Sequence, residues 1–259
     1  QKIIITWWAG FIGSNFLNKY VLLDPEIDFI NIDALTYAWK LENISDEVKK
    51  SPNYFFEKID IRDYEQIKKI YEKYKPTDII HFAAESHVDN SIKNPKIFTE
   101  TNILWTQNLL DAHRAFQLNR FHHISTDEVY GDLPNGWFFT ETTPINPSSP
   151  YSSSKAGSDL LVKAYGRTFW IDYVITRCSN NYGPNQDNEK LIPHFIELLQ
   201  NNKPVTVYGD GSNIRDWLYV EDHCDAIWEV FRKAQNKSIY NIGWNNEYTN
   251  LEITKLILQ

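Results

Sequence analysis

The sequence has few cysteines and no excess of positive charge, and each absence excludes a class of protein. Cys178 and Cys224 are the only cysteines among the 259 residues. Two are too few for a disulfide framework, and their places beside strand-like and helix-like segments favour reduced, buried thiols. The formal net charge is -8 and no basic stripe is present, so we expect no nucleic-acid partner.

Long apolar runs are absent as well. No run approaches the roughly 18 residues of a membrane-spanning helix, and no N-terminal signal pattern is visible. The sequence therefore predicts a soluble, cytoplasmic protein without a membrane partner. The hydrophobic fraction of 42% is enough for a core, and 259 residues fit one large α/β domain, alone or with a small lobe.

Glycine and methionine are also scarce, while tryptophan is abundant. The chain has ten glycines, no methionine and nine tryptophans. Tryptophan-rich chains are often lectins or interface proteins. Here, however, the tryptophans fall at turn positions, which neither class predicts.

Apolar strand-like runs alternate with helix-like segments over the first 180 residues or so. The strand-like runs lie at 2–6, 28–33, 54–61, 77–84, 120–126 and 172–180, and the helix-like segments at 14–24, 63–75, 97–116 and 151–169. This alternation predicts an α/β fold with a Rossmann-type, doubly wound parallel sheet. Beyond Asn181 the spacing becomes irregular, which predicts a smaller substrate-binding lobe over the carboxyl ends of the strands. We assign 1–180 and a returning segment 215–243 to the domain that forms this sheet, and 181–214 and 244–259 to the lobe.

The stretch WWAGFIG follows the first predicted strand and is typical of a dinucleotide-binding turn. Gly10 and Gly13 fit the second and third glycines of G-x-x-G-x-x-G, while Trp7 occupies the first place. Asp33 ends the second strand about 20 residues later, where a carboxylate binds the ribose hydroxyls of NAD and disfavours a 2′-phosphate. A glycine pair alone also fits an ordinary strand–helix turn, but Asp33 favours the cofactor.

Two further clusters indicate acid–base chemistry. Tyr151 and Lys155 lie on one face of a predicted helix, where the ammonium is expected to lower the pKa of the phenol and make it a base. Thr126, Asp127 and Glu128 follow a buried strand; the hydroxyl suits polarising a carbonyl, and the two carboxyls can divide acid and base roles. Taken singly, these clusters also fit a surface helix start and a solvated turn. Together they favour an oxidising active site.

Several longer motifs carry a family resemblance. They are AGFIGSNF, NIDALTYA, HFAAESHVDNSI, HHISTDEVYGDL, PYSSSKAGSDLLVKAY, RCSNNYGPNQ and VYGDGSNIRDWLYVEDH. With them the chain resembles the nucleotide-sugar branch of the extended short-chain dehydrogenases/reductases, most closely the dTDP-glucose 4,6-dehydratases. The resemblance implies an NAD-dependent lyase that converts dTDP-glucose to dTDP-4-keto-6-deoxyglucose, for deoxysugar and polysaccharide biosynthesis.

The resemblance also implies a role for each catalytic candidate. Tyr151, helped by Lys155 and Thr126, would deprotonate the glucose 4-hydroxyl while hydride passes to NAD. Glu128 would remove the C5 proton, and Asp127 would protonate the departing C6 hydroxyl. Hydride would then return to C6.

Binding residues follow from the same motifs. The implied NAD contacts are Gly10, Phe11, Ile12, Gly13, Asp33, Ala34, Leu35, Thr36, Asp60, Ile61, Phe82, Ala83, Ala84, Glu85, Ser86, Thr101, Tyr151, Lys155 and Asn181. The implied sugar-nucleotide contacts are Ser86, Thr126, Asn180, Lys190, Leu191, Thr206, Val207, Tyr208, Arg215 and Asn250. Arg215 and Lys190 suit the diphosphate, although either fits an ordinary surface charge. No metal is expected, and the resemblance implies a homodimer that pairs the helices at 97–116 and 151–169.

The chain departs from this family at seven positions. Tryptophan stands where the family usually has glycine at Trp7, Trp8, Trp39, Trp105, Trp137, Trp170 and Trp244. Independent substitutions would not select one residue type seven times. Indoles at positions 7 and 8 would fill the pyrophosphate site and demand backbone angles that tryptophan resists.

Two other functions therefore stay open. One is a nucleotide-sugar epimerase or decarboxylase, whose members usually lack the Asp–Glu pair after threonine. The other is a catalytically impaired nucleotide-sugar-binding protein. Family members also continue beyond the point that matches Gln259, so we expect an incomplete lobe.

Overall fold

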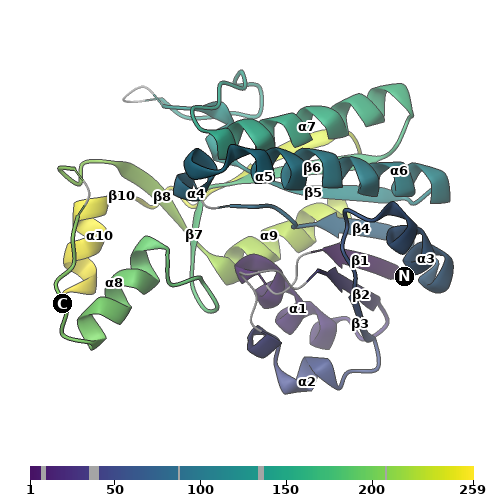
Figure 1. Cartoon of the computed structure of the whole chain (residues 1–259), viewed down its shortest axis with the longest axis horizontal. Coiled ribbons are helices and arrows are strands. Elements are labelled where there is room, and N and C mark those ends of the chain that lie inside the picture. Colours follow the sequence, from purple (N-terminus) through teal and green to yellow (C-terminus); the bar gives the residue numbers. More distant parts are fainter. Residues whose placement is uncertain (7–9, 35–40, 87, 134–136, 208) are drawn as a thin grey trace.

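A large parallel sheet forms the centre of the molecule. The computed structural model describes residues 1–6, 10–34, 41–86, 88–133, 137–207 and 209–259. Within those ranges the sheet has seven strands in the order β3-β2-β1-β4-β5-β6-β9, all parallel (Figure 1). They are β1 Lys2–Thr6, β2 Asp28–Asp33, β3 Tyr54–Lys58, β4 Asp78–His81, β5 Arg120–Thr126, β6 Tyr173–Cys178 and β9 Ser238–Ile242. The predicted Rossmann-type fold is confirmed.

The strand order reverses at β1. The chain runs from β1 outward to β2 and β3, and then returns so that β4 pairs with the other side of β1. Thr6 is therefore in register with Ile32 of β2 and with His81 of β4. Such a switch point leaves an opening at the carboxyl ends of the strands, which is where open α/β sheets bind ligands.

Helices cover both faces of this sheet because its apolar side chains point both ways. One face packs against α3 Tyr64–Tyr74, α6 Thr106–Phe116 and α7 Pro150–Thr168, and the other against α1 Phe11–Leu23, α2 Asp46–Lys49 and α9 Val220–Lys233. Figure 1 shows α6 and α7 above the sheet and α1 and α9 below it. None of the helices in the described part of the chain is long and apolar enough to cross a membrane. Cys178 and Cys224 are buried and free, as predicted.

The predicted helix at 97–116 is not one continuous α-helix. The structure has α4 Val88–Lys93, α5 Pro95–Thr99, a π-helical segment Glu100–Trp105, and then α6. The wider turn turns Thr101 and Asn102 inward, where both are buried. Asn102 bonds the backbone N–H and C=O of Glu85 at 2.8 and 3.1 Å and donates to Ser154 Oγ at 2.8 Å. These tertiary bonds hold the segment, and an apolar period does not reveal them.

A smaller sheet lies beyond the carboxyl edge of the large one. It has the order β10-β8-β7, with β7 Asn180–Tyr182, β8 Ile214–Tyr219 and β10 Glu247–Thr249. Helices α8 Leu191–Gln200 and α10 Asn250–Ile257 lie with it on the left of Figure 1. Within the predicted returning segment 215–243, β8 pairs in the small sheet, whereas α9 and β9 join the large one. The division into two domains stays a prediction.

Candidate active site

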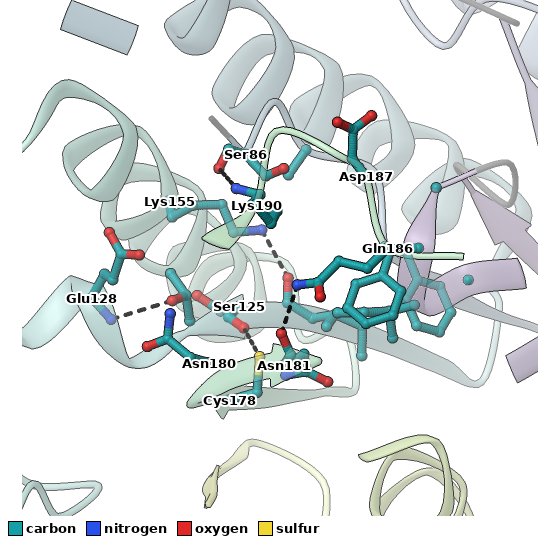
Figure 2. A pocket seen from close by; sticks show the side chains of 18 of the residues that line it. Ser86, Ser125, Glu128, Lys155, Cys178, Asn180, Asn181, Gln186, Asp187 and Lys190 are labelled. Atoms are coloured by element: carbon teal, nitrogen blue, oxygen red, sulfur yellow. Dashed lines mark hydrogen bonds between the residues drawn. The ribbon is translucent and has the colours of Figure 1, made fainter. Parts of the chain in front are cut away.

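A cavity of about 360 Å³ opens at the carboxyl ends of the large sheet (Figure 2). Its walls come from the start of α1, the segment after β4, the end of β5 with the start of α7, and the segment after β6. Lining residues are Gly10, Phe11, Ile12, Gly13, Asn43, Phe82, Ala84, Ser86, Ile124, Ser125, Thr126, Asp127, Glu128, Tyr151, Lys155, Cys178, Ser179, Asn180, Asn181, Asn185, Gln186, Asp187 and Lys190. All five predicted catalytic residues therefore share one cavity.

Tyr151 and Lys155 lie on the first two turns of α7. The helix starts there because Ser149 caps it through Ser152 and Pro150 occupies the first turn. Both side chains are buried, and the Lys155 ammonium donates to the backbone oxygen of Ile124 at 2.8 Å. Burial lowers the pKa of Lys155 to about 8.

The expectation that Lys155 lowers the pKa of Tyr151 is wrong for the polypeptide itself. Burial raises the pKa of Tyr151 well above its usual value, and the charge of Glu128 raises it further. A hydrogen bond with Thr126 offsets part of this rise. Burial of the phenol is the largest cause of the rise, and the ammonium of Lys155 donates to the Ile124 carbonyl.

Asp127 and Glu128 lie on a short helical turn that begins directly after β5. Thr126 caps it, its Oγ1 accepting from the backbone N–H of Glu128 at 3.3 Å. Burial and the charge of Glu128 raise the pKa of Asp127 to about 7. Burial also raises the pKa of Glu128, but the charges of Lys190 and Arg215 oppose that rise. One carboxyl of the pair thus suits an acid and the other a base.

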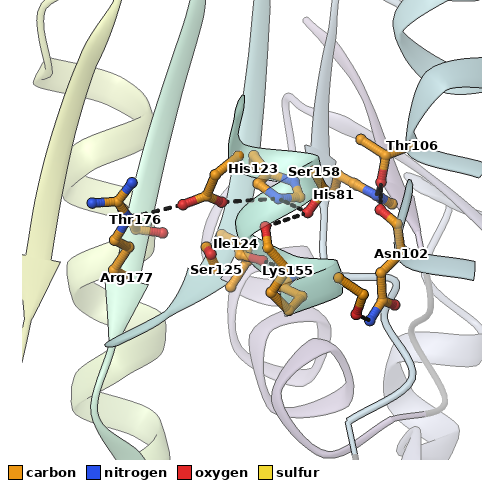
Figure 3. A network of polar contacts seen from close by, with 12 residues as sticks. His81, Asn102, Thr106, His123, Ile124, Ser125, Lys155, Ser158, Thr176 and Arg177 are labelled. Carbon is orange, nitrogen blue, oxygen red and sulfur yellow. Dashed lines mark hydrogen bonds and ion pairs between the residues drawn. The ribbon is translucent and has the colours of Figure 1, made fainter. Parts of the chain in front are cut away.

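Buried ionic contacts support this catalytic wall from behind (Figure 3). Arg177 on β6 donates from Nε to Asp159 Oδ2 of α7 at 2.8 Å, and from Nη1 to the Tyr130 hydroxyl at 2.8 Å. His123 on β5 bonds Ser158 of α7 at 3.1 Å. Burial lowers the pKa of His123 to about 4, so Arg177 is the positive partner of Asp159 at neutral pH. These contacts fix α7 against β5 and β6.

The opposite wall is made by the glycine turn. Gly10 is the N-cap of α1, no side chain caps this end, and the first turn carries no acidic residue. Its N–H groups therefore suit an anionic group in the cavity. Asp33, buried at the end of β2, lies one strand away from the turn. The uncapped helix start and the neighbouring carboxylate together have the arrangement of a dinucleotide site. Trp7 and Trp8, which precede Gly10 in the sequence, lie outside the described residues.

The structure does not bring every predicted binding residue to the cavity wall. Asp33, Ala34, Asp60, Ile61, Ala83, Glu85 and Thr101 are not among its lining residues, and neither are Leu191, Thr206, Val207, Arg215 and Asn250. Leu35, Thr36 and Tyr208 lie outside the described residues. The Asp60 carboxylate accepts from Arg62 Nε at 2.6 Å. The positive charge of Arg215 on β8 acts to lower the pKa values of both Asp127 and Glu128.

Lys190 reaches across the mouth of the cavity. Its ammonium donates to the backbone oxygen of Ser86 at 3.2 Å, as Figure 2 shows, which ties the segment after β7 to the segment after β4. Lys190 is partly buried and lines the cavity, and desolvation lowers its pKa. Lys190 therefore belongs to the site and not to the solvated surface.

Some lining residues were missed by the sequence reasoning. They are Asn43, Ile124, Ser125, Cys178, Ser179, Asn185, Gln186 and Asp187. Ser125 and Ser179 directly adjoin predicted residues, and Ile124 and Cys178 are one position further, so extending the motifs at Thr126 and Asn180 by two positions would have found these four. Asn43 carries no such signal, because only the folded chain brings it beside α1.

Trp39 lies outside the described residues, and the other four tryptophans at family glycine positions are not among the lining residues of the cavity. Trp105 ends the π-helical segment beneath the Arg62 guanidinium, which is 5.2 Å from the ring centroid. Trp137 and Trp244 are exposed. Trp170, just beyond α7, has a φ of +62°, in the left-handed region that favours glycine.

Comparison with known proteins places this geometry among nucleotide-sugar enzymes. The family model described as GDP-mannose 4,6 dehydratase matches residues 4–259. The dTDP-glucose 4,6-dehydratase of Neisseria gonorrhoeae is 46% identical over 267 residues, which cover 99% of this chain and 77% of that protein.

Solved structures agree in fold. A dTDP-glucose 4,6-dehydratase from Streptomyces venezuelae, crystallised with NAD and TYD, superposes with a TM-score of 0.95 at 43% identity, covering 100% of this chain and 80% of that one. A UDP-glucose 4-epimerase from Thermotoga maritima, solved with UDP-glucose, has a TM-score of 0.91 at 28% identity, with 99% and 81% covered. The fold is common to both activities, while the sequence is nearer to the dehydratases.

Proposed function

This chain belongs to the GDP-mannose 4,6 dehydratase family, and on that premise we propose that it is an NAD-dependent dTDP-glucose 4,6-dehydratase. The observation that carries the proposal is the Asp127–Glu128 pair, which shares a cavity with Tyr151 and Lys155. An oxidising site needs only the Tyr–Lys pair. Elimination of water needs an acid and a base in addition. Burial raises both carboxyl pKa values, but the charge of Glu128 adds to the rise at Asp127, whereas Lys190 and Arg215 oppose the rise at Glu128, so Asp127 suits the acid and Glu128 the base.

The described residues fit NAD. The uncapped N-terminus of α1 suits the pyrophosphate, and the buried Asp33 carboxylate suits the adenosine ribose. We propose as cofactor contacts the residues that the motifs imply, from Gly10–Gly13 and 33–36 through 60–61, 82–86 and Thr101 to Tyr151, Lys155 and Asn181. When bound, NAD supplies the hydride acceptor for C4 and a positive charge beside the phenol.

The residues of the chain then divide the proton transfers. Tyr151 takes the proton of the 4-hydroxyl, supported by Thr126 and by the buried ammonium of Lys155. The resulting 4-ketone acidifies the C5 proton, which the Glu128 carboxylate removes. Asp127, protonated near neutral pH, gives its proton to the departing C6 hydroxyl, and water leaves. Reduction at C6 and protonation at C5 complete the 4-keto-6-deoxy sugar.

The sugar nucleotide would lie between the cavity and the smaller lobe. Ser86, Thr126, Asn180 and Lys190 line the cavity. We propose that Leu191, Thr206, Val207, Tyr208, Arg215 and Asn250 complete the contacts with the sugar nucleotide. Arg215 and Lys190 suit the diphosphate, since a guanidinium holds phosphate oxygens in a bidentate way.

Product analysis tests this proposal. The chain is incubated with dTDP-glucose and NAD in deuterated water, and the product is examined by mass spectrometry and NMR. We expect loss of water, a methyl group at C6 and deuterium at C5. Inversion at C4 without loss of water would assign an epimerase instead.

An NAD titration tests the glycine turn directly. The chain is compared with its Trp7→Gly/Trp8→Gly double variant. Binding only by the double variant would show that indoles block the site and that this chain is a catalytically impaired relative. Binding by both would leave the dehydratase proposal intact.

We further propose a homodimer, located in the cytoplasm. Ile92, Leu104 and Leu160 expose half or more of their surface on α4, the π-helical segment and α7, which supports an apolar contact between copies. The free, buried cysteines fit a reducing compartment. Light scattering on the chain and on Leu160→Glu tests the dimer; a monomer mass for the unmodified chain at micromolar concentration would contradict it.

A further inference from the structure

A buried histidine lies behind the cavity wall and has no part in the proposed proton transfers. His223 lies in the first turns of α9 and is fully buried. Its Nδ1 is 2.8 Å from the side-chain oxygen Oδ1 of Asn181, which lines the cavity. Burial lowers the pKa of His223 to about 3, so the ring is neutral at physiological pH. A neutral imidazole has one donor and one acceptor nitrogen.

The neighbours of Asn181 fix both the amide and the imidazole. Asn181 Nδ2 donates to the backbone oxygen of Ser179 at 2.9 Å. A carbonyl can only accept, so the NH₂ group must face Ser179 and the amide oxygen must face His223. That oxygen in turn requires a donor, and the proton of His223 is therefore on Nδ1. Nε2 has no hydrogen-bond partner among the described residues, in agreement with this tautomer.

The backbone of Asn181 is held as well. Gln186 donates from Nε2 to the Asn181 carbonyl at 2.8 Å, and the contact is visible in Figure 2. With one amide hydrogen used on Ser179, the second has no acceptor in the described part of the chain. Asn181 is thus a rigid donor at the cavity wall, and it is rigid because His223 and Ser179 hold its two ends.

Strand order places this donor at the reacting end of the cofactor. Asp33, which suits the adenosine ribose, ends β2 on one side of β1, whereas β4, β5 and β6 follow on the other side. Thr126 at the end of β5 is in register with Cys178 at the end of β6, and Asn181 follows three residues later on β7. Asn181 therefore lies on the side of Tyr151 and not on the side of Asp33.

We propose that His223 is a positioning residue, which orients the Asn181 amide so that its remaining N–H meets an acceptor on the nicotinamide group of the bound cofactor. This inference rests on the proposed NAD site. The role of His223 is indirect, since it bonds Asn181 from behind the cavity wall and does not line the cavity.

Binding measured with two ligands tests the proposal without recourse to activity. NAD and ADP-ribose share the adenosine diphosphate and second ribose, but only NAD carries nicotinamide. We expect His223→Phe to weaken NAD binding about 5- to 10-fold, the worth of one hydrogen bond, and to leave the affinity for ADP-ribose within about twofold. His223→Asn places a donor at the same branch point as Nδ1, so we expect it to recover most of the NAD affinity.

A structural role alone would give a different pattern. Equal losses for both ligands in His223→Phe, or no recovery in His223→Asn, would overturn the proposal. Asn181→Ala should reproduce the selective loss, and adding His223→Phe to it should cost nothing more. If the unmodified chain binds neither ligand, the proposed NAD site itself fails, and this result is seen before any variant is compared.

A second measurement does not depend on cofactor binding. Nitrogen NMR of ¹⁵N-histidine-labelled protein distinguishes the two neutral tautomers, and His223→Asn assigns the signal. We expect His223 to carry its proton on Nδ1 in unmodified protein and to lose this preference in Asn181→Ala. A proton on Nε2 in the unmodified chain would refute the orientation argument whatever the binding data show.

Discussion

The two walls of the cavity are built in opposite ways. The catalytic wall consists of side chains on β5, α7 and the turn after β5, held by buried contacts such as Arg177–Asp159 and Lys155–Ile124. The cofactor wall at Gly10–Gly13 consists of backbone at a helix start, where no side chain caps the end. The catalytic wall acts through the functional groups of its side chains. The cofactor wall acts through backbone N–H groups that no side chain covers.

This difference shows how each wall tolerates change. A braced side chain keeps its place when a residue outside the brace is replaced, because packing fixes it from several directions. A backbone turn that must approach a pyrophosphate tolerates substitution poorly, because a side chain placed between the backbone and the pyrophosphate occupies the binding site. The same tryptophan substitution is therefore expected to be costly at positions 7 and 8 and mild at exposed positions such as 137.

The largest expected effect comes from removing the proposed base from the catalytic wall. Glu128→Gln should slow elimination by about 10²- to 10⁴-fold, the usual worth of an acid–base group, while oxidation at C4 stays possible. Reduced nicotinamide should then accumulate and be seen by its near-ultraviolet absorbance. Tyr151→Phe is the matched control, because it should suppress that absorbance change itself. Near-normal turnover of Glu128→Gln, with normal deuterium uptake at C5, would show that this carboxylate is not the base.

The second largest effect is expected from removing the buried Arg177–Asp159 ion pair behind the same wall. Asp159→Asn leaves the Arg177 guanidinium buried without its anion, and should lower the free energy of unfolding by about 3–5 kcal/mol. Urea denaturation measures the loss. The double variant Arg177→Met/Asp159→Leu removes both charges and should recover much of the stability. An unchanged midpoint for Asp159→Asn would mean that the buried pair does not stabilise α7 against the sheet.

A pH profile sharpens the distinction between the two carboxyls. Burial and the neighbouring Glu128 raise the pKa of Asp127 to about 7, so this acid is protonated below that pH and loses its proton above it. Elimination needs the protonated form, so its rate should fall as pH rises through about 7, approaching tenfold per pH unit. Asp127→Asn cannot titrate and should show a low rate without that limb. A limb of the same position in Asp127→Asn would assign it to another group.

The smallest expected effect concerns backbone strain at Trp170, which stands where the family usually has glycine. Trp170 follows α7 with a φ of +62° and is 78% exposed. Trp170→Gly should stabilise the fold by about 1 kcal/mol, because the left-handed conformation costs a non-glycine residue about that much. Thermal denaturation measures it, as a rise of a few degrees. Trp137 is exposed but not in the left-handed region, so Trp137→Gly should give no gain; equal gains would exclude backbone strain as the cause.

Much of the fold and site could be predicted because the signals are local. Buried parallel strands such as β1 and β6 are short apolar runs, and α3 shows its apolar stripe and its Asp63 cap in the sequence. The residues after β5 and those at the start of α7 could be placed together, since the carboxyl ends of neighbouring parallel strands meet at one edge. The π-helical segment at 100–105 could not, because bonds from Asn102 to Glu85 and Ser154 hold it.

The sequence by itself determined the alternation of strands and helices over the first 180 residues or so, the glycine turn, and the residue types gathered for oxidation and elimination. Periodicity, capping and motif spacing are properties of residues that are close in the sequence, so they can be recognised without the structure. Only the tertiary structure decided which way Lys155 directs its ammonium, how far the pKa of Asp127 rises, and that His223 meets Asn181 across 42 positions of sequence. The physical reason is that desolvation and hydrogen-bond partners depend on what surrounds a group in space, and segments distant in the chain supply those surroundings.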